Sequence, residues 1–402
     1  MKYFYYQIPT IACLLLLQVS AAFAQITEEE DLALAYGDKE TVSIATGNQQ
    51  PLRRAPAVAS VITAEDISAM GATDLDEVLE TVPGIHVTRA VFYTPRYIVR
   101  GIQSNPSDAR VLMMQNGIPV NTMFLGDKGQ NWGGLPLENI SRIEVIRGPG
   151  SALYGADAYS GTINLITKTA EDTPGTQLGV RGGSFNRWNT WTQYGGMLGP
   201  IDVAAYLGLG STDGIHETIT EDAQSNRDKI FHTHVSLAPG PVSIGYDAID
   251  ANLNLGYHQW RLRTGYKLRN NLGIGVGMGS ALDPMGRERS ERITTDLSWT
   301  DPQFAKDWGI GFTGSYLQYA ETMDENYQLS PPGTKLPTGT FPAGIIGDPD
   351  RFERQIRLAA FATYTGFTDH NLRFGLGHDD LDLYKTGTHK NYWLILGFEG
   401  IW

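Results

Sequence analysis

The stretch ISRIEVIRGPGSALYGADAYSGTINLIT, residues 140–167, carries two strand predictions from which the rest of the chain can be organised. Residues 143–147 and 161–167 are short runs that are rich in Ile, Val and Leu. Runs of this kind bounded by Gly and Pro are typical of strands. We therefore expect a small sheet built around this stretch.

The segments before this stretch add helices and further strands, so residues 51–170 are predicted to form one α+β domain. Thr63 with Asp66 three residues later is a capping pattern that opens a short helix. A second helix is expected to open at Thr73 and to stop at Pro83-Gly84. The other strand predictions are residues 85–88, 97–100 and 110–115, followed by a hairpin turn at Asn116-Gly117.

Residues 175–402 differ in character, because apolar and polar residues alternate along segments of about ten residues. Ile201 and Leu207 share one face of such a segment, and Asp202 lies on the other. Alternation also occurs in soluble β-sandwiches, so periodicity alone leaves that alternative open. The repeated segments and a long polar insertion at 321–351 favour an antiparallel transmembrane β-barrel. Its apolar face would meet lipid and its polar face would line the lumen.

The N-terminal segment has the pattern of an export signal. Residues 1–24 combine Lys2, a short apolar run and the small-residue pattern Ala22-Phe23-Ala24. Residues 25–50 are polar and acidic at first, which predicts a flexible arm. Cys13, the single cysteine of the chain, lies inside the signal, so the mature chain would hold neither a disulfide nor a thiolate metal site.

The composition excludes two classes of protein. The chain has 402 residues and a formal net charge of −13, without a cluster of Lys and Arg. Nucleic-acid binding is therefore not expected, because phosphate contacts need clustered cations. A helical membrane protein is also not expected, because after residue 25 no apolar run approaches the ~18 residues of a membrane-spanning helix.

Several ordered motifs in residues 57–167 resemble the plug domain of TonB-dependent outer-membrane receptors. They are AVASVITAEDI (57–67), LDEVLETVPGI (75–85), VRGI (99–102), QNGIPV (115–120), ISRIEVIRGPGSALYGA (140–156) and GTINLIT (161–167). The chain is most similar to the subgroup that imports iron-siderophore complexes and cobalamin and that colicins exploit.

This resemblance implies an exported outer-membrane receptor and importer, not an enzyme, with no cofactor, no resident metal and no catalytic residues. A scarce substrate, most simply an iron-siderophore, would bind outside. TonB, driven by its inner-membrane energising complex, would then bind a TonB box and remodel the plug. The implied partners are TonB, outer-membrane lipid and a metal chelate such as a ferric siderophore. The box falls on Glu40, Thr41, Val42, Ser43, Ile44, Ala45, Thr46 and Gly47. From the residues alone, this segment could also be a disordered leader, or a strand that adds to another protein's sheet.

Two stretches of the domain are candidates for ligand-binding loops at the plug apex, residues 90–96 and 121–132. Both combine aromatic side chains with a cation, which suits the charged or aromatic groups of a chelate. The candidate contacts are Tyr93, Arg96, Phe124, Lys128 and Trp132. The alternative is that these side chains only pack against the barrel wall.

The barrel is expected to be incomplete. Members of the family close about 22 strands around the plug, whereas residues 175–402 hold eight to ten strand candidates. An eight-stranded barrel would be filled by its own side chains. The chain is therefore interpreted as a fragment or a prematurely ended reading frame, or as a short barrel that a second chain completes.

Other functions stay open at this stage. A surface receptor for a ligand, phage or bacteriocin could bind without import, and cobalamin or another substrate could replace the siderophore. A barrel hydrolase would need a Ser-His pair, and none of the 8 histidines lies in a recognisable motif.

Three further patterns are given ordinary structural interpretations. Residues 273–279 alternate Gly with apolar residues, which predicts a strand and not a nucleotide loop. His232 and His234 would share one strand face without an evident third metal ligand. The acidic residues around His378 are expected to be solvated and not to bind calcium.

Overall fold

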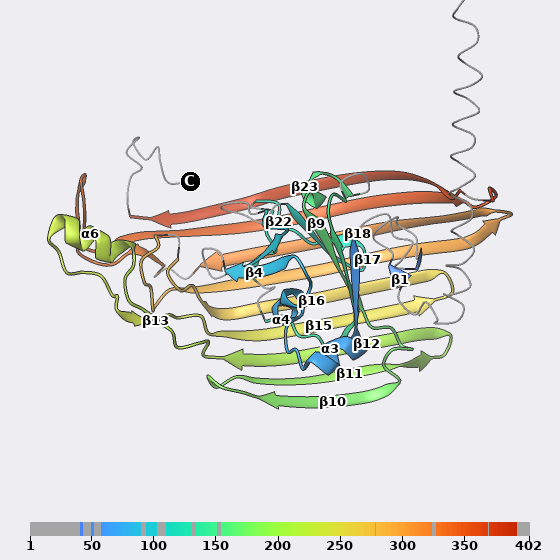
Figure 1. The fold of residues 1–402 in the computed structure, drawn as a ribbon, viewed down its shortest axis with the longest axis horizontal. Coiled ribbons are helices and arrows are strands. Elements are labelled where there is room, and N and C mark those ends of the chain that lie inside the picture. The colour runs from blue at the N-terminus through green and yellow to red at the C-terminus, as the bar shows by residue number, and fades with distance from the viewer. Residues whose placement is uncertain are drawn as a thin grey trace, which may run out of the picture.

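The computed structural model has two parts, an N-terminal domain (residues 58–170) and a large sheet (residues 175–390) (Figure 1). It describes residues 41–42, 50–51, 58–89, 94–102, 110–124, 126–130, 134–150, 154–277, 279–323, 327–368 and 370–391. The expected signal and most of the expected arm and TonB box lie outside these residues. Within the box, β1 (Thr41–Val42) pairs antiparallel with β2 (Gln50–Pro51).

The N-terminal domain is built on a five-stranded sheet with the order β3-β8-β9-β6-β7. Its strands are β3 (Ala59–Thr63), β8 (Ile140–Arg147), β9 (Gly161–Thr167), β6 (Val111–Gln115) and β7 (Ile118–Pro119). The strands β4 (Ile85–Arg89) and β5 (Pro95–Val99) form a separate hairpin, and η4 (Ala156–Ala158) precedes β9. The strand predictions for this domain are confirmed to within a few residues, as is the turn at Asn116-Gly117 between β6 and β7.

The first helix, α3 (Ala64–Met70), begins as the capping pattern predicts. Thr63 is the N-cap, and its side chain and that of Asp66 form a reciprocal capping box. These hydrogen bonds from Thr63 lower the pKa of the Asp66 carboxyl. Gly71, with φ of 68°, ends the helix in the left-handed conformation that glycine adopts without strain.

The second helix, α4 (Leu75–Glu80), begins one residue later than predicted. Its N-cap is Asp74 and not Thr73, because the Asp74 side chain accepts from the Glu77 N–H. The backbone N–H of Thr73 instead donates to Glu77 at 2.5 Å. Among the described residues, no helix is both long and apolar enough to cross a membrane.

The large sheet is antiparallel throughout and contains ten strands among the described residues, within the predicted range of eight to ten. In spatial order its long strands are β10 (Gly175–Gly182), β11 (Trp188–Leu198), β12 (Ile201–Thr212), β15 (Tyr246–Tyr257), β16 (Trp260–Gly273), β17 (Arg287–Ala305), β18 (Trp308–Met323), β22 (Ile345–Tyr364) and β23 (Leu372–Lys390). The tenth, β19 (Gln328–Ser330), pairs with the start of β22. Within the described residues no ladder joins β10 to β23, so these strands do not close into a cylinder.

The two ends of the large sheet differ. Residues 199–200, 258–259 and 306–307 make short turns at one end, whereas loops 213–245, 274–286 and 324–344 extend from the other. The loops contain β13 (Thr218–Ile219), α6 (Ala223–Phe231), β14 (Gly240–Pro241), β20 (Thr334–Leu336) and β21 (Gly339–Phe341). In Figure 1, α6 and β13 mark this long-loop end on the left. Short turns at one end and long loops at the other are typical of outer-membrane barrels.

Three predictions in this region are wrong in detail. The insertion predicted at 321–351 is shorter, because β18 continues to Met323 and β22 already begins at Ile345. The run 273–279 is not a strand, since β16 ends at Gly273 and Gly275 and Gly277 adopt positive φ in turns. His232 is not on a strand but caps the C-terminus of α6 with φ of 54°.

The two faces of the large sheet differ as the alternation predicts. Leu207 and Leu209 are exposed on the outer face, whereas Ala204 and Tyr206 are buried on the inner face. Near the short turns the outer face carries aromatic rings, such as Trp299 stacked on Phe312 at 6.3 Å. The others in this group are Trp260, Trp308, Tyr364, Phe367 and Phe374. An apolar outer band with an aromatic girdle is the pattern of a lipid-facing barrel wall.

Candidate functional site: the contact between the N-terminal domain and the large sheet

The inner face of the large sheet holds the N-terminal domain, and it is polar. Strands on both sides of the domain contact it: Arg181 on β10 reaches Glu138 at 2.5 Å, and Glu353 on β22 accepts from the Met123 N–H at 2.6 Å. The sheet therefore curves around the domain. Buried polar residues of the inner face include Gln193, Asp250, Asn254, Lys267, Arg269, Glu288, Ser290, Arg292, Asp296, Glu321, Arg351, Glu353 and Gln355.

Residues 121–130 of the domain form the segment that the large sheet grips most closely, and we call it the clamped loop. The Glu353 carboxylate accepts from the backbone N–H groups of Met123 (2.6 Å) and Phe124 (3.1 Å). The Gln355 amide donates to the Asn121 carbonyl at 2.9 Å. These contacts are with the main chain, so they fix the path of the loop whatever its side chains are.

The next two strands hold the other half of the clamped loop in the same way. Arg292 on β17 donates to the Lys128 carbonyl at 2.8 Å. The Tyr319 hydroxyl on β18 accepts from the Gln130 N–H at 3.3 Å. A Cβ atom on Gly129 would lie 2.8 Å from the Tyr319 ring, so the two backbones approach here as closely as glycine permits.

We expect Gly129→Ala to loosen this half of the clamp. Gly129 has φ of +68°, so alanine carries a conformational cost of about 1–2 kcal/mol. The contact with the Tyr319 ring adds an overpacking cost of about 1–3 kcal/mol. Hydrogen exchange of residues 121–130 should become faster.

Gly71→Ala is the matched control for that substitution. Gly71 has the same φ of +68°, but its Cβ would meet nothing within 4 Å. It therefore carries the conformational cost alone. Equal losses of stability in the two variants would show that the contact with Tyr319 has no energetic weight.

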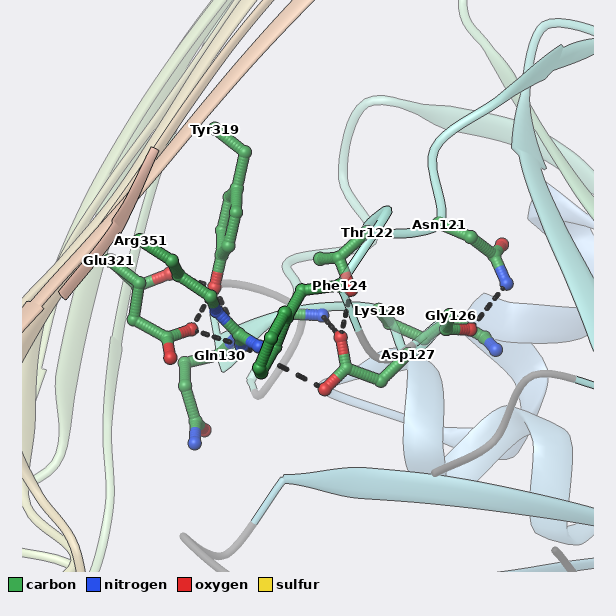
Figure 2. A network of polar contacts seen from close by, with 12 residues as sticks. Asn121, Thr122, Phe124, Gly126, Asp127, Lys128, Gln130, Tyr319, Glu321 and Arg351 are labelled. Atoms are coloured by element: carbon green, nitrogen blue, oxygen red, sulfur yellow. Dashed lines mark hydrogen bonds and ion pairs between the residues drawn. The ribbon is translucent and has the colours of Figure 1, made fainter. Parts of the chain in front are cut away.

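Arg351 lies at the centre of the side-chain network beside the clamped loop (Figure 2). Its guanidinium donates to Glu321 at 2.6 Å and lies 3.9 Å from Asp127. The same group stacks over the rings of Phe124 (5.6 Å) and Tyr319 (5.7 Å). Tyr319 also donates to Glu321. Arg351 thus joins two strands of the large sheet to the domain.

Asp127 orders the loop from within. Its carboxylate accepts from the Thr122 hydroxyl and from the Gly129 N–H at 3.1 Å. The Asn121 side chain donates to the Gly126 carbonyl at 2.8 Å. Figure 2 shows this bond and the bond from Thr122 to Asp127. The loop therefore presents a preformed surface to the sheet.

A second polar contact lies on β15 and β16. Asp250 is paired with Lys267 at 2.9 Å and with Arg269 at 3.0 Å, and all three are buried. Arg269 also donates to the Gly134 carbonyl of the domain at 3.4 Å. Buried ion pairs of this kind add little net stability but are costly to break singly.

Within the domain, Asp76 anchors the hairpin β4–β5 to α4. It accepts from the Tyr97 hydroxyl at 2.9 Å and is paired with Arg89 at 2.7 Å. Burial raises the pKa of the Asp76 carboxyl, and the two donors oppose that shift. The hairpin β4–β5 is thereby held on the body of the domain.

The five predicted ligand contacts are placed differently from one another. Phe124 is 55% exposed, on the clamped loop above Arg351. Arg96 is buried on β5, and Lys128 is fully buried with its ammonium on the Val111 carbonyl at 2.8 Å. Tyr93 and Trp132 lie outside the described residues. The assignment of all five to ligand binding stays a prediction.

The residues of the large sheet that hold the clamped loop were not identified from the sequence. Arg292, Tyr319, Arg351 and Glu353 all fall on the face that the alternation marks as polar. That signal shows which face they occupy, but it does not show which residues of the domain they meet. Among the described residues, no three or more His, Cys, Asp or Glu side chains are grouped so that they could hold a metal.

Comparison with known protein families matches the N-terminal domain. Residues 51–162 match the family model described as TonB-dependent Receptor Plug Domain. This range includes all of the clamped loop and both helices of the domain. The contacts described above therefore join a plug-type domain to the inner face of a sheet.

Curated relatives extend the similarity into the large sheet. A vitamin B12 transporter, BtuB of Vibrio vulnificus, is 35% identical over 145 residues, which are 35% of this chain and 23% of the relative. An iron-regulated outer membrane virulence protein of Vibrio cholerae is 28% identical over 306 residues, 73% of this chain and 44% of the relative. The chain thus spans less than half of the length of each.

A solved structure supports the fold of most of the chain. The ferric yersiniabactin uptake receptor FyuA from Yersinia pestis has a TM-score of 0.55 and 17% sequence identity. The match covers 83% of this chain and 50% of that receptor. At this identity the likeness concerns the architecture, a domain held within a wall of long antiparallel strands.

Proposed function

Given that this chain belongs to the TonB-dependent outer-membrane receptors, we propose that it acts in the energised import of a scarce metal chelate, with a ferric siderophore as the substrate class. The observation that carries the proposal is the clamped loop. The N-terminal domain occupies the inner face of the wall and is held there by hydrogen bonds and ion pairs, several of them to main-chain atoms. Such contacts hold the domain on the wall and can still be released.

The proposed cycle has a binding step and a release step. Substrate arrives at the long-loop end, where the clamped loop exposes Phe124 above Arg351. TonB then pulls on residues 40–47, which precede the domain in the chain. After the domain the chain enters β10 at the short-turn end of the sheet. In this cycle the long-loop end binds the substrate and the short-turn end faces TonB. No covalent bond is made or broken.

The proposal of a siderophore depends on the chemistry at the clamped loop. An exposed aromatic ring over a guanidinium suits a chelate with aromatic or negatively charged groups. The names of the two curated relatives cover vitamin B12 and iron regulation, so cobalamin is the alternative substrate. A surface receptor that binds without import is the alternative from another class.

A growth experiment tests the substrate class. The gene is deleted in its host, and growth under iron limitation is measured with single ferric siderophores, with haem, and with an unchelated iron control. A parallel series supplies cobalamin in a strain that depends on it. We expect loss of growth on at least one siderophore, restored by the intact gene. Normal growth on every siderophore together with a loss on cobalamin would contradict the siderophore and favour the alternative.

A further inference from the structure

Glu288 on β17 is a buried carboxylate without a hydrogen-bond donor. Its exposure is 2%, and neither of its oxygens has a partner among the described residues. A buried ionised carboxylate in this condition is costly, since burial removes water without replacing it. The mechanism proposed above makes no use of this residue.

Glu288 lies above the lipid-facing band, at the long-loop end of its strand. On the outer face of the same strand Arg289 and Glu291 form an ion pair at 3.1 Å, whereas the exposed apolar residues begin at Ile293. Glu288 therefore lies outside the level of the membrane core, and Asp127 of the clamped loop is among the charges that act on it.

The nearest acidic neighbour is Glu321, which lies on the same inner face of the adjacent strand. The register pairs Ser290 with Glu321 and Glu288 with Met323, so the two glutamates are diagonal neighbours. Their carboxyl groups are close enough that the charge of Glu321 opposes the ionisation of Glu288. Two ionised carboxylates have no proton to donate, so this contact becomes a hydrogen bond only if one of them is protonated.

The existing donors on Glu321 leave room for such a bond. Tyr319 and Arg351 both donate to its Oε2 atom. The Oε1 atom is then the acceptor that a protonated Glu288 would use. A metal ion is the weaker explanation, because no cluster of three acidic or imidazole ligands occurs among the described residues.

The charged groups that act on Glu288 are more negative than positive. The acids are Glu321 from β18 and Asp127 from the clamped loop, and the base is Arg351 from β22. Arg292 follows on the buried face of β17 itself. Tyr319 is neutral. An ionised Glu288 would add an excess negative charge beside Glu321 and Asp127, in a region that excludes water.

We propose that Glu288 is a proton-binding site, that its carboxyl group donates to Glu321, and that this proton holds the clamped loop on the large sheet. At neutral pH the site is occupied and the clamp is closed. As the pH rises the proton is lost, Glu288 repels Glu321 and Asp127, and the Arg351 network loosens. The inference concerns the resting structure and does not depend on the identity of the substrate.

The test is infrared titration of the purified full chain in detergent micelles. We expect the C=O stretching band of a protonated carboxylic acid at about pH 7, well above the usual titration of glutamate at about pH 4.3. The band should have the intensity of one carboxyl group and should be lost in Glu288→Gln. Glu291→Gln is the matched control, because Glu291 lies on the opposite face of the same strand and accepts from Tyr266.

Hydrogen exchange of residues 121–130 provides the second readout. Exchange, corrected for its intrinsic pH dependence, should become faster in the native chain and in Glu291→Gln as the pH rises toward about 9, and should stay slow in Glu288→Gln. Absence of the band from the native chain at neutral pH overturns the proposal, and this needs no variant. A band that persists in Glu288→Gln also overturns the proposal. So does a pH response of hydrogen exchange that is the same in the native chain, Glu288→Gln and Glu291→Gln.

Discussion

Deletion of residues 40–47 is expected to abolish energised uptake while leaving binding at the cell surface unchanged. The segment precedes the N-terminal domain, and the described contacts that hold the domain in the large sheet come from residues after it. Removing it therefore leaves the clamped loop, the Arg351 network and the exposed Phe124 in place. The deletion removes only the TonB box, the segment that TonB would bind.

The measurement compares binding and transport of one radiolabelled ferric siderophore, chosen as a substrate by the growth experiment. Binding is measured on cells without an energy source, and transport on energised cells. Deletion of residues 28–35 is the matched control, because it removes the same length from the arm outside the box. Uptake that persists without residues 40–47 would show that the TonB box does not lie in this segment. Loss of binding as well would mean that the segment supports the binding surface.

Arg351→Met is expected to destabilise the chain by about 3–5 kcal/mol, the cost of leaving buried acids without their cation. Arg351 is 8% exposed and is the ion-pair partner of Glu321, with Asp127 at 3.9 Å. Methionine keeps much of the side-chain volume but supplies no charge. The clamped loop should detach, and hydrogen exchange of residues 121–130 should rise more than that of the core of the domain.

Arg354→Met on the same strand is the matched control for this prediction. Arg354 lies on the outer face, is paired with Asp382 at 2.7 Å, and has a side chain that is 53% exposed. Its loss should cost no more than about 1 kcal/mol. Adding Glu321→Gln to Arg351→Met should recover part of the stability, because one unpaired acid is removed. Similar effects of the two arginine substitutions would contradict the central place of Arg351.

Local signals in the sequence predict the elements of this chain well. Thr63 and Asp66 open α3 as expected, because the capping box is made by residues three apart. The alternation assigns the inner and outer faces correctly where it was read, as at 201–209, because a strand places successive side chains on opposite sides. The resemblance of residues 51–170 to a plug domain is confirmed over 51–162.

Where the prediction fails, two local signals compete. Thr73 and Asp74 are both good caps, and Asp74 is used because Glu77 is then free to accept from Thr73. Residues 273–279 have a period of two, yet glycine at positive φ turns the chain there. His232 takes a left-handed conformation at a helix end, which histidine adopts more readily than branched residues do.

The candidate site depends on pairings that a single sequence does not reveal. Met123 and Glu353 are 230 residues apart, and Lys128 and Arg292 are separated by 164. Lys128 is predicted to be a ligand contact, and its buried ammonium donates to the Val111 carbonyl. Phe124 is predicted to be one too, and it does lie exposed. Lys128 is buried and Phe124 is exposed because of where the domain contacts the large sheet, which the sequence does not reveal.

The central claim is that the large sheet is a wall with its apolar face in lipid and its polar face on the N-terminal domain. It is tested most directly by spin labels on single cysteines at residues 292–299 of β17, in the chain reconstituted into lipid vesicles. Oxygen, which is concentrated in lipid, should relax labels at Ile293, Thr295, Leu297 and Trp299 strongly and labels at Arg292, Thr294, Asp296 and Ser298 weakly. Equal relaxation at odd and even positions, or strong relaxation of all of them by a water-soluble agent, would contradict the account.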